Sequence, residues 1–191
     1  MKKLEKKYII NIPHNIKVFY DKKKKIIIFK GFSGQKSLKI EKLLTISHKK
    51  QQIELSNDNN IKLSNSQKKK IQQIQKTTVS LIKQLLIETT SIIYQKLNFV
   101  GVGYRAFPVE NFEKHLFLFR LGYSHPIYFK IPQKTRIISL KLTKLFLYGS
   151  SYQELTSTAS KIRLNKTPEP YKGKGILYEN EKIVLKEGKK V

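Results

Sequence analysis

The sequence lacks cysteine altogether, which narrows the chemistry that its 191 residues could perform. Without cysteine there is no disulfide framework, no cysteine-ligated zinc site and no thiol nucleophile. The four histidines, at positions 14, 48, 115 and 125, are scattered without the H-E-x-x-H spacing of zinc-dependent hydrolases. No paired acid and base occur at a recognisable spacing. We therefore expect no catalytic residues, no metal and no cofactor.

Long apolar runs are absent as well. The densest stretch, residues 81–93, is interrupted by Lys83, Gln84 and Glu88, so it falls short of the roughly 18 apolar residues that a membrane span needs. The first five residues, Met1 to Glu5, lack the apolar core of a signal peptide. We expect a soluble chain that does not insert into a membrane.

Acidic residues are few, 13 against 39 lysines and arginines, which gives a formal charge of +26. Self-repulsion of this size disfavours a compact state unless a polyanion neutralises it. Only four of the basic residues are arginine. Because lysine, isoleucine and asparagine are read from A/T-rich codons, we attribute part of the charge to an A/T-biased genome. The excess still indicates an anionic partner.

Two regions of strands, each followed by a helix, are predicted along the chain. Residues 9–40, 43–48 and 52–55 have strand patterns, and residues 67–93 have the three- and four-residue apolar spacing of a helix. We expect the second half of that helix to be buried on two sides. Further strands are predicted at 95–100, 115–121, 126–131, 136–140 and 145–148, and a helix at 151–166 with a capping box formed by Ser151 and Glu154.

The two halves of the chain are similar to each other. Residues 29–34, FKGFSG, have a counterpart in residues 119–124, FRLGYS. This predicts an α+β fold of two tandem homologous domains, residues 1–94 and 95–191, each an antiparallel β-sheet packed with one α-helix. Two unrelated small α+β domains remain the alternative.

Residues 101–106, GVGYRA, match the G-x-G-x-x-A pattern of dinucleotide-binding loops. That pattern requires a following helix and an acidic residue about 20 positions later. Phe107 and Pro108 come next instead, and no acidic residue lies between Glu113 and Glu154. A bulged strand whose glycines permit close backbone approach fits better.

Residues 167–176, TPEPYKGKGI, form the most distinctive stretch. Prolines fix its backbone, and glycines beside two lysines allow backbone N–H groups to approach a phosphate. Because unpaired RNA bases stack on aromatic rings, we expect Tyr171 to lie next to RNA. The alternatives are a solvated basic tail or, for the whole chain, an amphipathic protein whose helix 67–93 faces an anionic membrane surface.

Three motifs together carry a resemblance to a known family. They are FVGVGYRA at 99–106, LGYSHP at 121–126, and PEPYKGKGI at 168–176 followed by Tyr178 and Glu181. In order and spacing they closely resemble ribosomal protein six of the large subunit, in its bacterial and organellar form. The match runs through residues 99–190 and is looser in the first half, where Ile12-Pro13 and Lys30-Gly31 carry it.

The resemblance implies a non-catalytic constituent of the large ribosomal subunit. It implies binding to large-subunit ribosomal RNA, mainly through the second domain, near the sarcin–ricin loop and the place where elongation factors dock, with other ribosomal proteins as neighbours. Leu164 and Leu177 depart from the family, which commonly has arginine in these places. The RNA-facing residues that it implies are Arg163, Lys166, Pro168, Glu169, Pro170, Tyr171, Lys172, Gly173, Lys174, Gly175, Tyr178, Lys182, Lys186, Lys189 and Lys190.

The family's N-terminus begins almost where this sequence does, so we expect no presequence. With the A/T bias, this favours a mitochondrial ribosome and an organelle-encoded protein. A plastid or the cytoplasm of an A/T-rich bacterium is the alternative.

Overall fold

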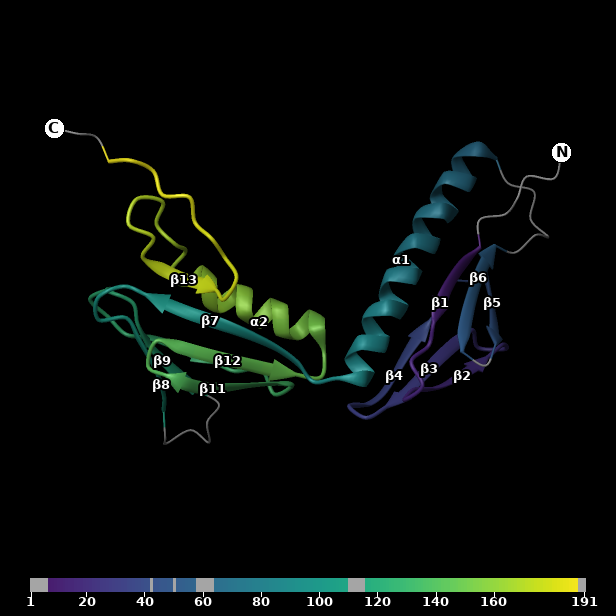
Figure 1. Ribbon diagram of the computed structural model, residues 1–191, viewed down its shortest axis with the longest axis horizontal. Coiled ribbons are helices and arrows are strands. Elements are labelled where there is room, and N and C mark those ends of the chain that lie inside the picture. The colour runs from purple at the N-terminus through teal and green to yellow at the C-terminus, as the bar shows by residue number, and fades with distance from the viewer. Residues whose placement is uncertain (1–6, 42, 50, 58–63, 110–115, 189–191) are drawn as a thin grey trace. The chain divides into compact units, whose positions relative to one another are not determined.

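The computed structural model describes residues 7–41, 43–49, 51–57, 64–109 and 116–188 (Figure 1). The chain divides into two compact units, Met1–Ser91 and Ile92–Val191. The division lies close to residue 94, where the sequence pattern changes from helix to strand.

The first unit contains two antiparallel three-stranded sheets and one long helix. One sheet has the strand order β1-β6-β5 and the other the order β2-β3-β4. The elements are β1 (Tyr8–Asn11), β2 (Lys17–Asp21), β3 (Ile26–Gly31), β4 (Gly34–Lys39), β5 (Leu44–Lys49), β6 (Gln52–Asn57) and α1 (Asn65–Thr90).

The second unit repeats this arrangement and adds one strand. Its sheets have the orders β10-β9-β8 and β11-β12-β7-β13. The elements are β7 (Ile93–Val100), β8 (Arg105–Pro108), β9 (Leu116–Arg120), β10 (Ile127–Lys130), β11 (Thr135–Lys141), β12 (Lys144–Gly149), α2 (Tyr152–Leu164) and β13 (Gly175–Tyr178).

The strand order is the same in both units: β1-β6-β5 corresponds to β7-β12-β11, and β2-β3-β4 corresponds to β8-β9-β10. In each unit the helix follows the sixth strand. The predicted α+β fold with tandem sheet units is confirmed. Each unit has two sheets instead of the single one predicted, because the fifth strand pairs with the sixth and not with the fourth.

Each core forms where the helix covers the sheets. In the first unit, Ile27 and Phe29 alternate with more exposed residues along β3 and meet Ile71, Ile82 and Leu86 of α1. In the second, α2 contributes Leu155, Ala159 and Ile162. Part of the apolar surface of α1 thus packs against sheet, where the membrane-surface alternative would place it against lipid. Neither helix of the described chain is long and apolar enough to cross a membrane.

Helix capping differs from the prediction. Ser151 makes no capping hydrogen bond with its side chain, and Glu154 instead forms an ion pair of 2.8 Å with Lys134. A complete capping box exists at the start of α1, where the Ser64 hydroxyl accepts from the Gln67 N–H and the Gln67 side chain accepts from the Ser64 N–H. The predicted box was wrong: the Ser151 hydroxyl caps no N–H of the helix, and the carboxylate of Glu154 is paired with Lys134.

The second half of α1 is not buried on two sides, contrary to the prediction. Leu81 is 45% exposed and Ile87 is 59% exposed. Only one face meets the sheets, and it contains the carboxylate of Glu88, which is 3% exposed and forms an ion pair of 3.1 Å with Lys36. The side chain of Gln84 donates a second hydrogen bond to Glu88 at 2.9 Å. A buried charge is tolerated here because it is paired and hydrogen-bonded.

The turn between β3 and β4 is held against the C-terminal end of α1. The Ser33 N–H donates to the Thr89 carbonyl at 3.1 Å. At Gly31, a Cβ would lie 2.4 Å from the same carbonyl oxygen. Glycine is therefore required at Gly31 by close approach, and the turn has a fixed position on the helix.

Candidate nucleic-acid interface

The residues that follow α2, 165–188, are called the C-terminal segment. It leaves the helix, forms a loop, enters β13 and passes back beside the loop. The Ile176 N–H donates to the Lys166 carbonyl and the Glu169 N–H to the Lys174 carbonyl, both at 2.9 Å, which closes the loop. The Lys186 N–H donates to the Pro170 carbonyl, also at 2.9 Å, which fixes the returning chain. The described part of the segment is therefore a hydrogen-bonded structure and not a solvated tail.

The two glycines of the loop have different surroundings. Gly173 has a φ of +67°, and a Cβ there would approach only the side chain of Leu185, at 3.4 Å. Gly175 is buried, with a φ of +155°, and a Cβ there would lie 2.5 Å from the Cα of Pro168. Gly175 is thus required for packing inside the protein. From Gly175 onward the chain is not an irregular loop. Residues Gly175–Tyr178 form the strand β13, which pairs with β7.

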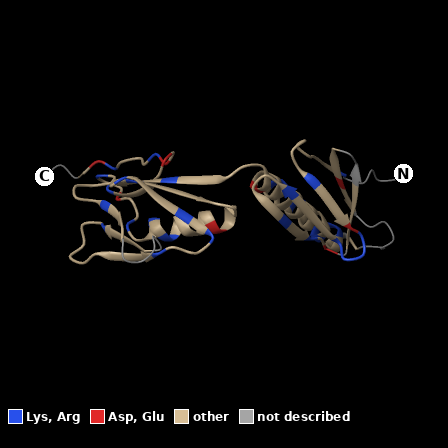
Figure 2. Cartoon of the chain, turned by 90° about the horizontal axis from the view of Figure 1, so that it is seen from below, with Lys and Arg blue, Asp and Glu red and all other residues tan. Residues whose placement is uncertain are grey.

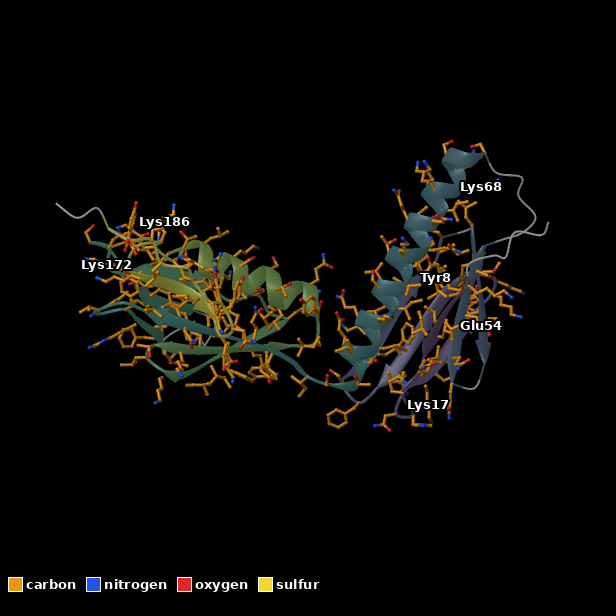
Figure 3. All side chains as sticks on the ribbon, turned by 45° about the horizontal axis from the view of Figure 1, so that its top comes forward. Tyr8, Lys17, Glu54, Lys68, Lys172 and Lys186 are labelled. Carbon is orange, nitrogen blue, oxygen red and sulfur yellow. The ribbon has the colours of Figure 1, made fainter. Side chains whose placement is uncertain are left out.

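Six of the thirteen predicted RNA-facing residues that the structure describes are exposed at the surface of the C-terminal segment. Tyr171 is 54% exposed, and Lys172 and Lys186 lie at the same end of the second unit (Figure 3). Lys189 and Lys190 lie outside the described residues. The exposed members are Glu169, Pro170, Tyr171, Lys172, Lys182 and Lys186; Arg163, Lys166, Pro168, Gly173, Lys174 and Tyr178 are half-buried, and Gly175 is buried.

Arg163 binds the C-terminal segment to α2. Its Nε donates to a carboxylate oxygen of Glu181 at 3.2 Å, and its terminal nitrogen donates to the other oxygen. The Tyr178 N–H donates to the same carboxylate at 3.1 Å. The hydrogen bond from Arg163 lowers the pKa of the Glu181 carboxyl below its ordinary 4.5. The guanidinium therefore positions the segment, and its contact with RNA stays a prediction.

Tyr123 contacts the start of the C-terminal segment, which the sequence did not reveal. Its hydroxyl donates to the Asn165 carbonyl at 3.1 Å, and the Lys166 ammonium lies 4.3 Å from the centre of its ring. The ring of His125 stacks beside it, with centroids 5.8 Å apart. The only sequence hint was the LGYSHP motif in which both residues stand. Tyr123 and Lys166 line a hollow of about 330 Å³ with Tyr104, Leu164, Asn165, Thr167, Glu169 and Lys174.

The G-x-G pattern at residue 101 accommodates an aromatic ring. Gly101 lies against the ring of Tyr104, where a Cβ would be 2.9 Å from three ring carbons. Tyr104 is 7% exposed and belongs to the core. The chain continues into β8 and not into a helix. A turn between two strands replaces the predicted bulged strand, and no helix N-terminus is available for a pyrophosphate at this described turn.

Lysine and arginine outnumber aspartate and glutamate by 39 to 13 in the sequence, and Figure 2 shows lysine and arginine, in blue, on both units. Within the described parts of the chain, no group of three histidine, aspartate or glutamate side chains could hold a metal ion. The chemistry that the C-terminal segment offers is therefore cationic contact together with an exposed tyrosine ring.

Comparison with known proteins places these features in a family. The family model described as Ribosomal protein L6 matches residues 100–179. Large ribosomal subunit protein uL6 of Spiroplasma citri is 37% identical over 164 residues, 85% of each chain. That of Mycoplasmoides gallisepticum is 35% identical over 183 residues, 95% of this chain and 93% of the relative. That of Variovorax paradoxus is 40% identical over 110 residues, 58% of this chain and 60% of the relative. The chain belongs to the ribosomal protein L6 family.

Proposed function

We propose that the chain is a structural constituent of the large ribosomal subunit and binds its ribosomal RNA through the C-terminal segment. The observation that carries this proposal is the loop at 167–174. It presents Tyr171 and Lys172 to solvent while hydrogen bonds at both ends fix its backbone. Fixed loops that present cations and a ring are suited to phosphate contact and base stacking.

The loop and the returning chain of the C-terminal segment bring separate lysines to the same end of the second unit (Figure 3). Lys172 comes from the loop, and Lys186 comes from the returning chain, whose backbone is bonded to Pro170. Several phosphates can thus be contacted at once by one fixed structure. Membership in the family supports a position near the sarcin–ricin loop and the elongation-factor site, with neighbouring ribosomal proteins around it. It also supports a role in supporting translation without catalysis.

A salt titration of binding to a large-subunit RNA fragment tests the proposal. With about six phosphate contacts, affinity should fall about a thousandfold between low and moderate salt, because each contact releases counterions. The double change Lys172→Gln with Lys174→Gln should reduce the slope of log K against log salt by up to about two.

The matched control is Lys130→Gln with Lys141→Gln, two exposed lysines of the same unit on β10 and β11. This control removes the same charge and should leave the slope close to that of the unchanged chain. A flat slope for the unchanged chain, or equal effects of the two double changes, would contradict docking through the C-terminal segment.

The mitochondrial location remains a prediction from codon bias. The relatives named above are bacterial proteins, and they agree with the bacterial alternative. Sequencing the DNA that flanks the coding region decides between the two: mitochondrial genes on both sides would support the organelle, and a bacterial operon would exclude it.

A further inference from the structure

We propose that the outer face of the β2-β3-β4 sheet is a second RNA site, which takes an unpaired strand. The bases would stack on Phe19 and Phe32, and Lys17 and Lys30 would contact the phosphates. This site lies in the first unit. The inference goes beyond the proposed function and does not require the C-terminal segment to touch RNA.

The site is a shallow hollow of about 660 Å³ on the sheet. Phe19 is 56% exposed and Phe32 is 87% exposed. Two rings left in water on one face are unusual for a soluble unit with a complete core, since exposed apolar patches mark interaction surfaces. The hollow is lined by Asn15, Lys17, Phe19, Ile28, Lys30, Gly31, Phe32 and Gln35.

The backbone that carries Phe32 has a fixed position before any partner arrives. It stands in the tight turn between Gly31 and Gly34, which pair with each other at the end of the β3-β4 hairpin. The hydrogen bond from Ser33 to Thr89 and the close approach at Gly31 fix this turn on α1. Because the backbone of this turn is already ordered, binding at Phe32 does not have to order the loop, which favours affinity.

The two lysines of the hollow face each other across the sheet. Lys17 of β2 stands directly opposite Lys30 of β3 in the register of the pair. Figure 3 labels Lys17 at the lower edge of the first unit. Like charges in this arrangement destabilise a sheet, and neither lysine has an ion-pair partner in the described part of the chain. A phosphate between them would remove the repulsion.

The lining favours RNA over a protein partner. It contains no carboxylate among the described residues, and the centres of protein interfaces are depleted in lysine. A protein would need two acidic groups placed opposite the lysines as well as an apolar surface for the rings. A single strand supplies phosphates and base faces together. Asn15 and Gln35 add amide groups that can donate to and accept from base edges.

The absence of tryptophan from the chain permits a specific test. Phe32→Trp in the full chain introduces the sole tryptophan, whose fluorescence a stacked base should quench. The probe is a single-stranded uridine oligonucleotide of about ten residues, and we expect saturable quenching. Adding Lys17→Gln and Lys30→Gln should weaken binding about tenfold and lower the salt slope by about 1.4, the value for two contacts on a single strand.

Three controls separate this site from general attraction to a basic chain. Ile9→Trp places the probe on the other sheet of the first unit, at a residue that is 58% exposed, and should show no quenching. Heparin, a polyanion without bases, should compete with the oligonucleotide but not quench. Lys172→Gln with Lys174→Gln should leave the quenching intact, whether or not the C-terminal segment binds RNA.

The proposal is overturned by any of four results. They are an unquenched Phe32→Trp chain, equal quenching of Ile9→Trp, quenching by heparin, and unchanged affinity after loss of both lysines. If isolated ribosomal proteins shift the tryptophan emission of the Phe32→Trp chain and RNA does not, the hollow belongs to a protein partner and the proposal is overturned as well.

Discussion

Replacing Gly175 by alanine tests whether the C-terminal segment is a packed part of the second unit. A Cβ at this position would lie 2.5 Å from the Pro168 Cα, 2.7 Å from the Pro168 nitrogen and 2.9 Å from the Thr167 carbonyl carbon. All three are backbone atoms, so no side chain can rotate away to make room. Either β13 or the start of the loop must shift.

The expected loss combines two contributions. Inserting a methyl group into a filled site costs about 1–3 kcal/mol, and a φ of +155° is strained for a residue with a Cβ, at about 1–3 kcal/mol. We expect about 3 kcal/mol in total. For a unit of this size that corresponds to a fall in Tm of about 12 °C.

Gly173→Ala is the matched control. Its φ of +67° is also unfavourable for alanine, but the nearest atom is the flexible end of Leu185 at 3.4 Å, so we expect about 1 kcal/mol. The assays are thermal unfolding of the full chain and hydrogen exchange of the Ile176 amide, which is bonded to the Lys166 carbonyl. An unchanged Gly175→Ala protein, or equal losses for both variants, would refute the packing argument.

Two further outcomes concern charged pairs. Because Arg163 lowers the pKa of Glu181 in the folded chain, this carboxylate stabilises the second unit above about pH 4.5, and the contribution is lost as pH falls through the lowered pKa. Glu181→Gln should therefore lower Tm at neutral pH, and the difference in Tm from the unchanged chain should shrink as the pH falls below the ordinary pKa of 4.5. A constant difference across thermal melts at several pH values would contradict this. Lys36→Met removes the ion-pair partner of the buried Glu88 and should cost about 2 kcal/mol in denaturant unfolding; adding Glu88→Leu should recover most of the loss, and a double variant less stable than Lys36→Met would speak against it.

Local pattern predicted the elements that have strong periodicity. The helix expected at 67–93 is α1, Asn65–Thr90, because its apolar spacing matches one buried face. Exposure of Leu81 and Ile87 could not be predicted, since the sequence does not show how wide a face the sheets cover. The strand β13 was missed because its four residues, the first of them a glycine, carry little periodicity. Its partner β7 lies far away in the chain.

The candidate site, too, could be predicted only where local sequence is informative. Tyr171 and Lys172 stand in a proline- and glycine-rich stretch, which indicates a surface loop, and they are exposed. The contact of Tyr123 with Asn165 joins residues 42 positions apart, and no local pattern encodes such a pairing. A single sequence also does not show that Arg163 reaches the carboxylate of Glu181, 18 positions away, and the contact of Arg163 with RNA stays a prediction.

The pairing of β13 with β7 affects the order in which the second unit can fold. Tyr178 lies opposite Leu97 in this ladder, so the closing contact joins the beginning of the second unit to its last strand. Contacts of such long separation form late, because the intervening chain must first be brought together. During synthesis all other described strands of the unit are complete before the loop can take its shape. The loop at 167–174 can therefore reach its final structure only after the rest of the second unit has folded.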